Sequence, residues 1–219
     1  MVMLVCPPGV YRAQSDTAVL GQVMEHGGFA VGRTVLDLGT GSGALALAAW
    51  RGGAAGVTAV DVSGLAVAAA WFNSRLHRAP VVVRRGDLFG PVSGRRFGLI
   101  LANPPYVPAE FAALPRRGIS RCWDGGLDGR TVIDRVCDGA AGRLTDDGVL
   151  LMVHSGLCGA DVTITRLGAA GMAARVLDRA RIPFGPVMRA RARMLELRGL
   201  VAPGQTLEEL VVIEARRAR

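Results

Sequence analysis

Short apolar runs alternate along the chain with longer mixed segments, several of which end in glycine. Short apolar runs are typical of buried strands, and the mixed segments between them are typical of connecting helices. Strands are predicted at residues 33–39, 56–63, 81–89, 97–106, 148–156, 172–184 and 208–217. Helices are predicted at residues 10–27, 43–53, 64–78, 129–144, 160–171 and 186–200. We expect Ser15 or Asp16 to cap the first helix, because both side chains can accept hydrogen bonds from free backbone N–H groups.

Strands separated by helices predict βαβ units, and hence an α/β fold with a mostly parallel, doubly wound sheet. In such a sheet a ligand binds outside the carboxyl ends of the strands, close to the point where the strand order reverses. Four polar residues fall at or just beyond predicted strand ends, namely Asp37, Asp61, Asp87 and Asn103. We therefore expect the ligand site where these four residues converge.

Length and composition fit one domain of 219 residues that buries a substantial core. Half of the residues are hydrophobic, which excludes a largely disordered chain. We expect a helical leader at 1–30, a cofactor-binding core at 31–156 and a C-terminal part at 157–219 that completes the sheet. No apolar run approaches the ~20 residues that a membrane span needs, and the N-terminus lacks a basic signal region. The sequence thus predicts a cytoplasmic protein that does not bind membranes.

The formal net charge of +8 comes from arginine, because the chain contains no lysine. Two interpretations stay open: a solvated arginine-rich surface, or an electrostatic preference for RNA or another acidic partner. For the predicted basic helix with Arg189, Arg191, Arg193 and Arg198, a solvated face is favoured over contact with ribosomal RNA or an acidic protein. The four cysteines lack metal-ligand spacing and the three histidines stand singly, so no metal site is predicted.

The stretch LDLGTGSG, residues 36–43, joins the first predicted strand to a helix. Gly39, Gly41 and Gly43 permit positive φ and let a ligand approach the backbone closely. Their spacing is neither the G-x-G-x-x-G of pyrophosphate binders nor a P-loop. It also departs from the G-x-S-x-G of hydrolases, which argues against that class. Asp37 precedes the glycines, and its carboxylate suits a cationic group such as the ammonium of an amino-acid moiety.

The next two strand ends add groups that suit an adenosine. Asp61, followed by Val62, can accept hydrogen bonds from both ribose hydroxyls, and Asp87 and Leu88 are placed for the exocyclic amine and the face of adenine. The alternative is a glycine turn that only serves strand–helix packing, with the acidic residues as helix caps. Three carboxylates at successive strand ends favour a bound adenosine-type cofactor.

The fourth predicted strand ends in LILANPPYVP, residues 99–108. The side-chain carbonyl of Asn103 and the backbone carbonyl of Pro104 can each accept one N–H of a planar NH₂ group. Proline locks φ, so this backbone is held in place beforehand, and Tyr106 can pack against the flat face of an amide or a base. The alternative is a stiff strand exit in which Asn103 caps a turn. The pattern favours a clamp for a planar nitrogen.

The acidic, glycine-rich stretch RCWDGGLDGR, residues 121–130, follows the predicted clamp and is expected to form a loop on the substrate side. Trp123, Asp124 and Asp128 are candidates for contact with a substrate. For Asp128, a role as the cap of the next helix is an equally good interpretation.

These motifs resemble those of the S-adenosylmethionine-dependent class I methyltransferases. More narrowly, the chain resembles the HemK-like glutamine-N5 methyltransferases that modify translation release factors. The resemblance rests on VLDLGTGSGALAL (35–47), AVDVS (59–63), GDLF (86–89), LILANPPYVP (99–108) and WDGGLDGRTVIDRV (123–136). It implies a Rossmann-like, seven-stranded, mostly parallel sheet with an antiparallel last strand, S-adenosylmethionine as cofactor, and methyl transfer to a planar nitrogen.

The start of the chain, YRAQSDTAVL, resembles the short leader of the compact HemK2-type members, which carry a Tyr…Asp-Thr pattern there. That match implies that Thr17 contacts the cofactor, and that a small activator subunit can serve as partner. Two departures concern the substrate. Arg-Ala-Gln follows Tyr11 in place of a more acidic version, and residues 181–200 form a basic insertion before the last strand.

The predicted activity is N-methylation with S-adenosylmethionine, and the leading substrate is the side-chain amide of a protein glutamine, as in a release factor. N6-adenine methylation of RNA, less so of DNA, is the alternative reaction, and an inactive cofactor-binding scaffold or partner subunit is the alternative of another class. The predicted catalytic residues are Asn103, Pro104 and Tyr106. The predicted substrate contacts are Asn103, Pro105, Tyr106 and Trp123. The predicted cofactor contacts are Thr17, Asp37, Gly39, Gly41, Gly43, Asp61, Val62, Asp87, Leu88 and Asn103.

Overall fold

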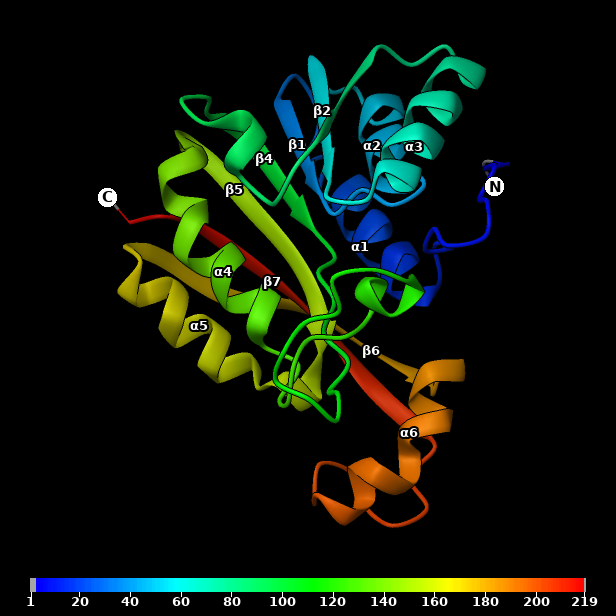
Figure 1. Ribbon diagram of the computed structural model, residues 1–219. Coiled ribbons are helices and arrows are strands. Elements are labelled where there is room, and N and C mark those ends of the chain that lie inside the picture. The colour runs from blue at the N-terminus through cyan, green and yellow to red at the C-terminus, as the bar shows by residue number, and fades with distance from the viewer. Residues whose placement is uncertain (1–2, 219) are drawn as a thin grey trace.

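The computed structural model describes residues 3–218 and contains a seven-stranded sheet with helices on both faces (Figure 1). The strands are β1 (Thr34–Leu38), β2 (Gly56–Asp61), β3 (Val81–Arg85), β4 (Phe97–Ala102), β5 (Leu144–Ser155), β6 (Met172–Pro183) and β7 (Leu207–Arg217). The helices are α1 (Ser15–His26), α2 (Ala44–Arg51), α3 (Gly64–Leu76), α4 (Thr131–Ala140), α5 (Ala160–Ala169) and α6 (Pro186–Leu197).

The strand order is β3-β2-β1-β4-β5-β7-β6, and β7 runs in the direction opposite to the other six strands. The predicted doubly wound, mostly parallel sheet with an antiparallel last strand is confirmed. The chain proceeds outward from β1 to β3 and then returns to place β4 on the other side of β1. The strand order therefore reverses between β1 and β4, and the carboxyl ends of these two strands are where this kind of sheet binds a ligand.

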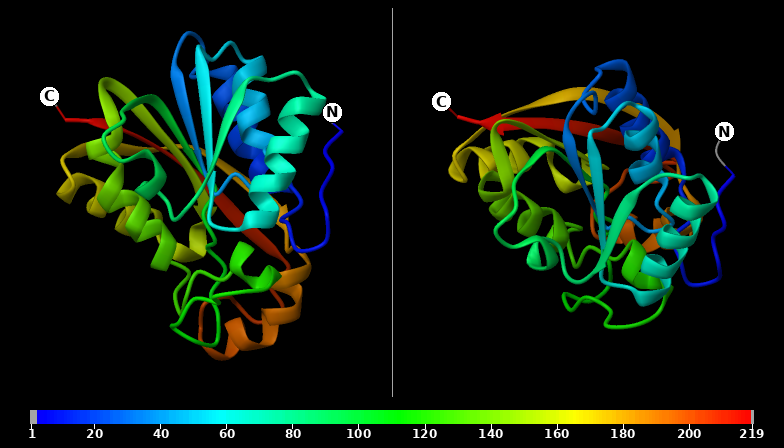
Figure 2. Two further views of the ribbon diagram at one scale, coloured as in Figure 1. Left: turned by 45° about the horizontal axis from the view of Figure 1, so that its top comes forward. Right: turned by 90° about the horizontal axis from the view of Figure 1, so that it is seen from above.

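Helices α1, α2 and α3 cover one face of the sheet, and α4 and α5 cover the other (Figure 2). The central strands are consequently buried from both sides. This explains why β4 is an uninterrupted apolar run, with Leu99, Ile100 and Leu101 fully buried, instead of an alternation of apolar and polar residues.

Several element boundaries differ from the predictions: β3 ends at Arg85 and not at 89, and β5 begins at Leu144 and not at 148. Two differences concern the site. β4 ends at Ala102 and not at 106, because Pro104 and Pro105 have no N–H to continue the ladder. α1 begins at Ser15, with Gln14 at the N-cap position and no side-chain cap. The prediction that Ser15 or Asp16 caps this helix is therefore wrong: both lie inside it, and the Asp16 carboxylate accepts hydrogen bonds from two tyrosines.

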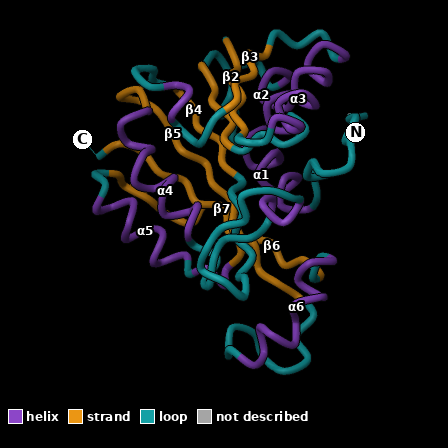
Figure 3. The backbone as a smooth tube through the Cα atoms, in the orientation of Figure 1, coloured by secondary structure: helices purple, strands orange, loops and turns teal. Residues whose placement is uncertain are grey.

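The connection from β4 to α4 has little regular structure beyond a 3₁₀ turn at Ile119–Cys122 (Figure 3). β6 and β7 are long strands, and α6 connects them at the lower end of the molecule in Figure 1. The basic segment 181–200 thus consists of the end of β6, α6 and the turn that follows. Within residues 3–218, no helix is long and apolar enough to cross a bilayer, and no group of three potential metal ligands gathers.

Candidate active site

A cavity of ≈ 520 Å³ opens at the carboxyl ends of β1, β2 and β4, where the strand order reverses. Its lining comes mainly from the loop after β1, the ends of β2, β3 and β4, the segment 9–17 that leads into α1, and the β4–α4 connection at 114–124. Every predicted cofactor contact except Asp37 and Gly43 lines this cavity. Asp61, Asp87 and Asn103 thus meet around one space, although they belong to three different strand ends.

The glycine loop makes a sharp turn between β1 and α2. Gly39, Gly41 and Gly43 have φ values of 69°, 55° and 88°, so each adopts the left-handed conformation that the sequence predicts. Gly41 donates its backbone N–H to Asp61 Oδ2 at 3.0 Å, which ties the loop to β2. Gly43 serves packing: a Cβ there would lie 3.3 Å from the Cα of Ala70, so glycine allows α2 to approach α3.

Asp37 lies behind the glycine loop and is not among the residues that line the cavity. It is 1% exposed, and its Oδ2 accepts hydrogen bonds from Thr40 Oγ1 at 2.6 Å and from the Ala46 N–H at 3.0 Å. Burial raises its pKa to about 6, and these two hydrogen bonds oppose the rise. Asp37 therefore braces the loop against α2, and the ammonium contact predicted for it stays a prediction.

Asp61 is better placed for a ligand. Its Oδ1 accepts a hydrogen bond from the Ser63 N–H at 2.8 Å, and burial raises its pKa while the backbone hydrogen bonds lower it. Each carboxylate oxygen can accept a further hydrogen bond, so the ribose role predicted for Asp61 is compatible with these contacts.

Asp87 is more exposed than Asp61 and forms an ion pair with Arg135 at the same cavity. Leu88 has a φ of 44°, a strained value for a side chain that bears a Cβ, and such strain is typical of ligand sites.

A second cavity, of ≈ 310 Å³, adjoins the first. The two share Tyr11, Asn103 and Cys122 in their linings, so Asn103 stands at their junction. Pro104, Tyr106 and Trp123 line the second cavity, whereas Pro105 lines the first. The residues of the predicted clamp therefore face a space next to the predicted cofactor cavity.

The first turn of α1 holds the clamp in place. Thr17 Oγ1 accepts a hydrogen bond from Asn103 Nδ2 at 3.2 Å. Asp16 Oδ2 accepts two more, from the Tyr106 hydroxyl at 3.1 Å and from the Tyr11 hydroxyl at 2.8 Å. Because the amide nitrogen of Asn103 is already bound, its Oδ1 is left to accept a hydrogen bond from a ligand.

The sequence predicts that Tyr106 packs against a substrate, but it does not predict the hydrogen bond from the Tyr106 hydroxyl to Asp16. The tyrosine side chain is buried, and burial raises the pKa of Tyr106 well above the usual value, so the hydroxyl remains a donor to Asp16. Sequence reasoning missed Asp16 because the two residues are far apart in the chain. The only available signal was the Tyr…Asp-Thr pattern, which was used to assign Thr17 to the cofactor. The structure places Thr17 at that cavity and also on Asn103.

We predict that Thr17→Val lowers kcat about tenfold, because valine leaves the Asn103 amide without the acceptor that orients it. Thr17→Ser keeps a hydroxyl and should retain most of the turnover. Steady-state kinetics together with cofactor titration by calorimetry would check this. A loss of cofactor affinity with unchanged kcat would show that Thr17 serves the cofactor alone.

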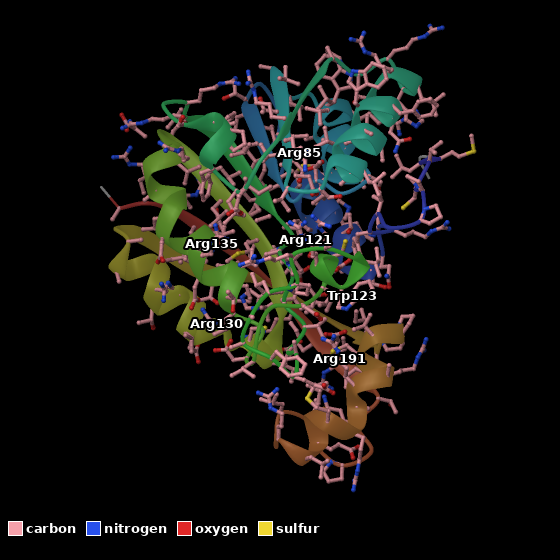
Figure 4. The ribbon with its side chains drawn as sticks, viewed as in Figure 1. Arg85, Arg121, Trp123, Arg130, Arg135 and Arg191 are labelled. Carbon is pink, nitrogen blue, oxygen red and sulfur yellow. The ribbon has the colours of Figure 1, made fainter. Side chains whose placement is uncertain are left out.

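Arginines of α6 and its C-cap bind the loop at 108–127, which is on the predicted substrate side. Arg191 forms an ion pair with Asp124 at 2.6 Å and donates to the Pro108 carbonyl, and Figure 4 shows Arg191 beside the loop that carries Trp123. Arg198 donates to the backbone carbonyls of Ala109 at 3.1 Å and Leu127 at 2.7 Å. The favoured interpretation of the basic helix as a solvated face is therefore wrong for Arg191, which neutralises Asp124 in a loop distant in sequence. Arg198, at the C-cap of α6, is exposed and binds backbone carbonyls of the same loop.

Asp128 neither lines a cavity nor caps α4, the two roles considered for it from the sequence. Its Oδ1 accepts a hydrogen bond from the Arg130 N–H at 3.0 Å, so it stabilises the turn before α4. Arg130 occupies the N-cap position, and Asp128 belongs to neither cavity lining.

We predict that Arg191→Ala lowers the free energy of unfolding by about 2 kcal/mol, because it leaves the largely buried Asp124 carboxylate without its cation. Arg193→Ala is the matched control. Arg193 lies two residues further along α6, and its side chain is 80% exposed. This variant should change stability by less than about 0.5 kcal/mol. Chemical denaturation of both variants tests this, and equal midpoints would contradict it.

The first cavity suits a nucleoside with an amino-acid tail. Gly39 and Gly41 leave the backbone accessible, Asp61 offers two acceptor oxygens for neighbouring hydroxyls, and Val62 and Leu88 supply apolar contacts for a base. These residues therefore fit the adenosine-type cofactor that the sequence predicts.

Comparison with known proteins identifies the family. A family model described as "Methyltransferase small domain" matches residues 2–113. A Methanocaldococcus jannaschii protein named as a candidate protein N5-glutamine methyltransferase is 30% identical over 181 residues, which cover 83% of this chain and 90% of that protein. A release factor glutamine methyltransferase of Bordetella pertussis is 36% identical over 156 residues, 67% of this chain and 57% of the relative. The chain also matches 39% of the ribosomal protein uL3 glutamine methyltransferase of Bradyrhizobium diazoefficiens, at 47% identity over 124 residues.

Solved structures share the fold. The E. cuniculi Mtq2–Trm112 complex, described as responsible for methylation of the translation termination factor eRF1, aligns with a TM-score of 0.66 at 23% identity over 96% of this chain and 99% of that chain. The T. thermophilus 16S rRNA N2 G1207 methyltransferase, solved with AdoMet and guanosine, aligns with a TM-score of 0.64 at 22% identity over 96% of this chain and 46% of that chain. Both have the class I, Rossmann-like methyltransferase fold. On the family match and the M. jannaschii relative, the chain belongs to the methyltransferase small domain family and is an S-adenosylmethionine-dependent methyltransferase.

Proposed function

We propose that this enzyme methylates the side-chain amide nitrogen of a protein glutamine. The observation that carries the proposal is the position of Asn103, which lines the cofactor cavity and the second cavity together. The names of the relatives support glutamine as the target. The chain spans 90% of the M. jannaschii relative but 39% and 57% of the two bacterial ones, so the substrate protein is inferred from the site as well as from these names.

S-adenosylmethionine, when bound, supplies an electrophilic methyl group on a sulfonium. An amide nitrogen is a weak nucleophile because its lone pair is delocalised. Asn103 Oδ1 and the Pro104 carbonyl can each accept one N–H of the target NH₂ group, which holds the nitrogen and directs its out-of-plane lone pair toward the first cavity. Both acceptors strengthen their hydrogen bonds as positive charge develops on the nitrogen. Thr17 keeps Asn103 Oδ1 free for this role.

The charge of the second cavity favours a protein over a nucleic acid. Asp16 and Glu208 line it, and both are buried. No arginine or histidine is among the described residues that line it. An ionised carboxylate in this lining repels a phosphodiester but not a neutral amide, and the described part of the lining offers no cation to offset the repulsion. The chain as a whole is basic, at +8, so its surface charge and its second cavity have opposite sign.

A small activator subunit is part of the proposal. The E. cuniculi relative was solved as a complex with Trm112, and we infer that a protein of that kind can assemble with this chain. Addition of such a subunit to an inactive preparation should restore cofactor binding or turnover.

The test offers a release factor, ribosomal protein uL3, total RNA and DNA in parallel, with tritium-labelled S-adenosylmethionine. We expect label in protein only, and mass spectrometry should place one added methyl group on a glutamine. Label in RNA or DNA would overturn the proposal in favour of adenine methylation. Retained cofactor binding with no label in any pool, with and without an activator subunit, would favour the scaffold.

A further inference from the structure

Glu208 is a buried carboxylate in the second cavity that the mechanism does not use. It lies at the start of β7, is 4% exposed and lines the cavity together with Asn103, Pro104 and Trp123. Its Oε2 finds no hydrogen-bond donor among residues 3–218. A buried polar atom without a partner is costly, and such atoms in native proteins are often satisfied by a ligand.

The groups around Glu208 do not supply the missing donor. The Asp16 carboxylate on α1 lines the same cavity and can only accept hydrogen bonds, and the Ser155 hydroxyl on β5 acts on Glu208 by lowering its pKa. The hydroxyls of Tyr11 and Tyr106 are donated to Asp16, and the Cys158 thiol lies against the Tyr106 carbonyl. Burial, together with Asp16, raises the pKa of Glu208 to about 7, while Ser155 lowers it.

We infer that Glu208 is a substrate-binding residue, which accepts a hydrogen bond from an N–H group of the peptide segment that flanks the target glutamine. This inference rests on the proposed function. An N–H donor is the chemistry that complements an unpartnered carboxylate oxygen, and both the peptide backbone and the side chains of basic residues provide it. The aromatic rings of Tyr11, Tyr106 and Trp123 in the same lining suit either source.

Glu208→Gln should raise the KM for a glutamine peptide roughly tenfold with little change in kcat, because the charge on the acceptor is lost. The probe is a synthetic peptide that spans a glutamine methylated by the wild-type enzyme. Glu209→Gln is the matched control: Glu209 is the next residue of β7 and pairs with Arg179 outside the cavity, so this variant should keep the wild-type KM. Glu208→Leu removes the acceptor altogether and should raise KM at least as much.

A pH profile separates substrate binding from a structural role. As pH falls through about 7, Glu208 takes up a proton and loses its charge, so the wild-type KM should rise toward acidic pH. With saturating cofactor, the Glu208→Gln variant should lose this rise. Asp37, whose pKa is raised to about 6, braces the cofactor loop and does not line the second cavity. Tyr11, Tyr106 and Cys158 do not titrate in this range, because the pKa of each is raised by burial.

Two peptide series identify the source of the N–H. One replaces a backbone amide beside the glutamine with an ester, and the other replaces flanking basic residues with norleucine. One of these changes should raise the wild-type KM and have no further effect on Glu208→Gln. An unchanged KM for Glu208→Gln, with glutamine methylation intact, would overturn the inference but leave the proposed function standing. Failure of the wild-type enzyme to methylate any glutamine would overturn both.

Discussion

Replacement of Asn103 by alanine should lower kcat by about 10²–10³-fold, the effect expected when one positioned hydrogen-bonding group is removed from a reacting centre. The side chain contributes an acceptor at the junction of the two cavities, and alanine leaves only the Pro104 carbonyl to hold the target nitrogen. Cofactor affinity should change modestly, because the remaining lining of the first cavity is untouched. Single-turnover kinetics at saturating cofactor, with calorimetry of cofactor binding, would measure the two effects separately.

The expected pattern is specific to a clamp. If Asn103 only stiffened the exit of β4, Asn103→Ala would lower stability and leave turnover near normal. Turnover near the wild-type level would therefore rule out the clamp. The Thr17→Val variant should give a weaker version of the same kinetic defect, since it frees the Asn103 amide and leaves its carbonyl present.

Asp61→Ala should weaken S-adenosylmethionine binding by about ten- to a hundredfold, the equivalent of one charge-assisted hydrogen bond of roughly 1.5–3 kcal/mol. Two effects act together. The variant loses the carboxylate that lines the cavity, and it releases the Gly41 N–H that Asp61 Oδ2 binds at 3.0 Å. Isothermal titration calorimetry measures the change directly.

Asp146→Ala is the control for that experiment. The Asp146 side chain is 92% exposed at the start of β5, and its ion pairs are on the surface. Its removal should leave cofactor affinity unchanged. Equal affinity for Asp61→Ala and the wild type would remove Asp61 from the cofactor site.

The contrast between Asp37 and Asp61 shows why position in a sequence pattern does not assign a role. Both are acidic residues at or near the end of a parallel strand. Asp61 is the last residue of β2 and lines the cavity, whereas Asp37 lies one residue inside β1 and turns its carboxylate to Thr40 and the α2 backbone. In the register of these parallel strands Asp37 pairs with Ala59, two residues before Asp61. The Asp37 carboxylate therefore lies deeper in the sheet, beneath the glycine loop, whereas Asp61 lies beyond the end of β1 and at the cavity.

Helix α6 gives a second case. Its arginines are spaced along a short helix, and the sequence offers no sign of which of them meets a partner. Arg191 and Arg198 bind the loop at 108–127, while Arg193 is exposed. The difference depends on where β6 and β7 carry the helix relative to the loop, and that is set by the pairing of two long antiparallel strands.

The sequence by itself determined the α/β class, the antiparallel last strand implied by the family resemblance, and the left-handed glycines of the loop after β1. The α/β class and the glycine conformations depend on local chemistry, because apolar runs, glycine and proline restrict the backbone wherever they occur. The direction of the last strand follows from no such local pattern and was predicted from the family resemblance alone. Only the tertiary structure decided which side chains complete the clamp. Asp16 meets Tyr106, and Thr17 meets Asn103, because the sheet brings α1 against the end of β4. Contacts between residues so distant in the chain depend on the packing of the whole fold, and no local pattern encodes them.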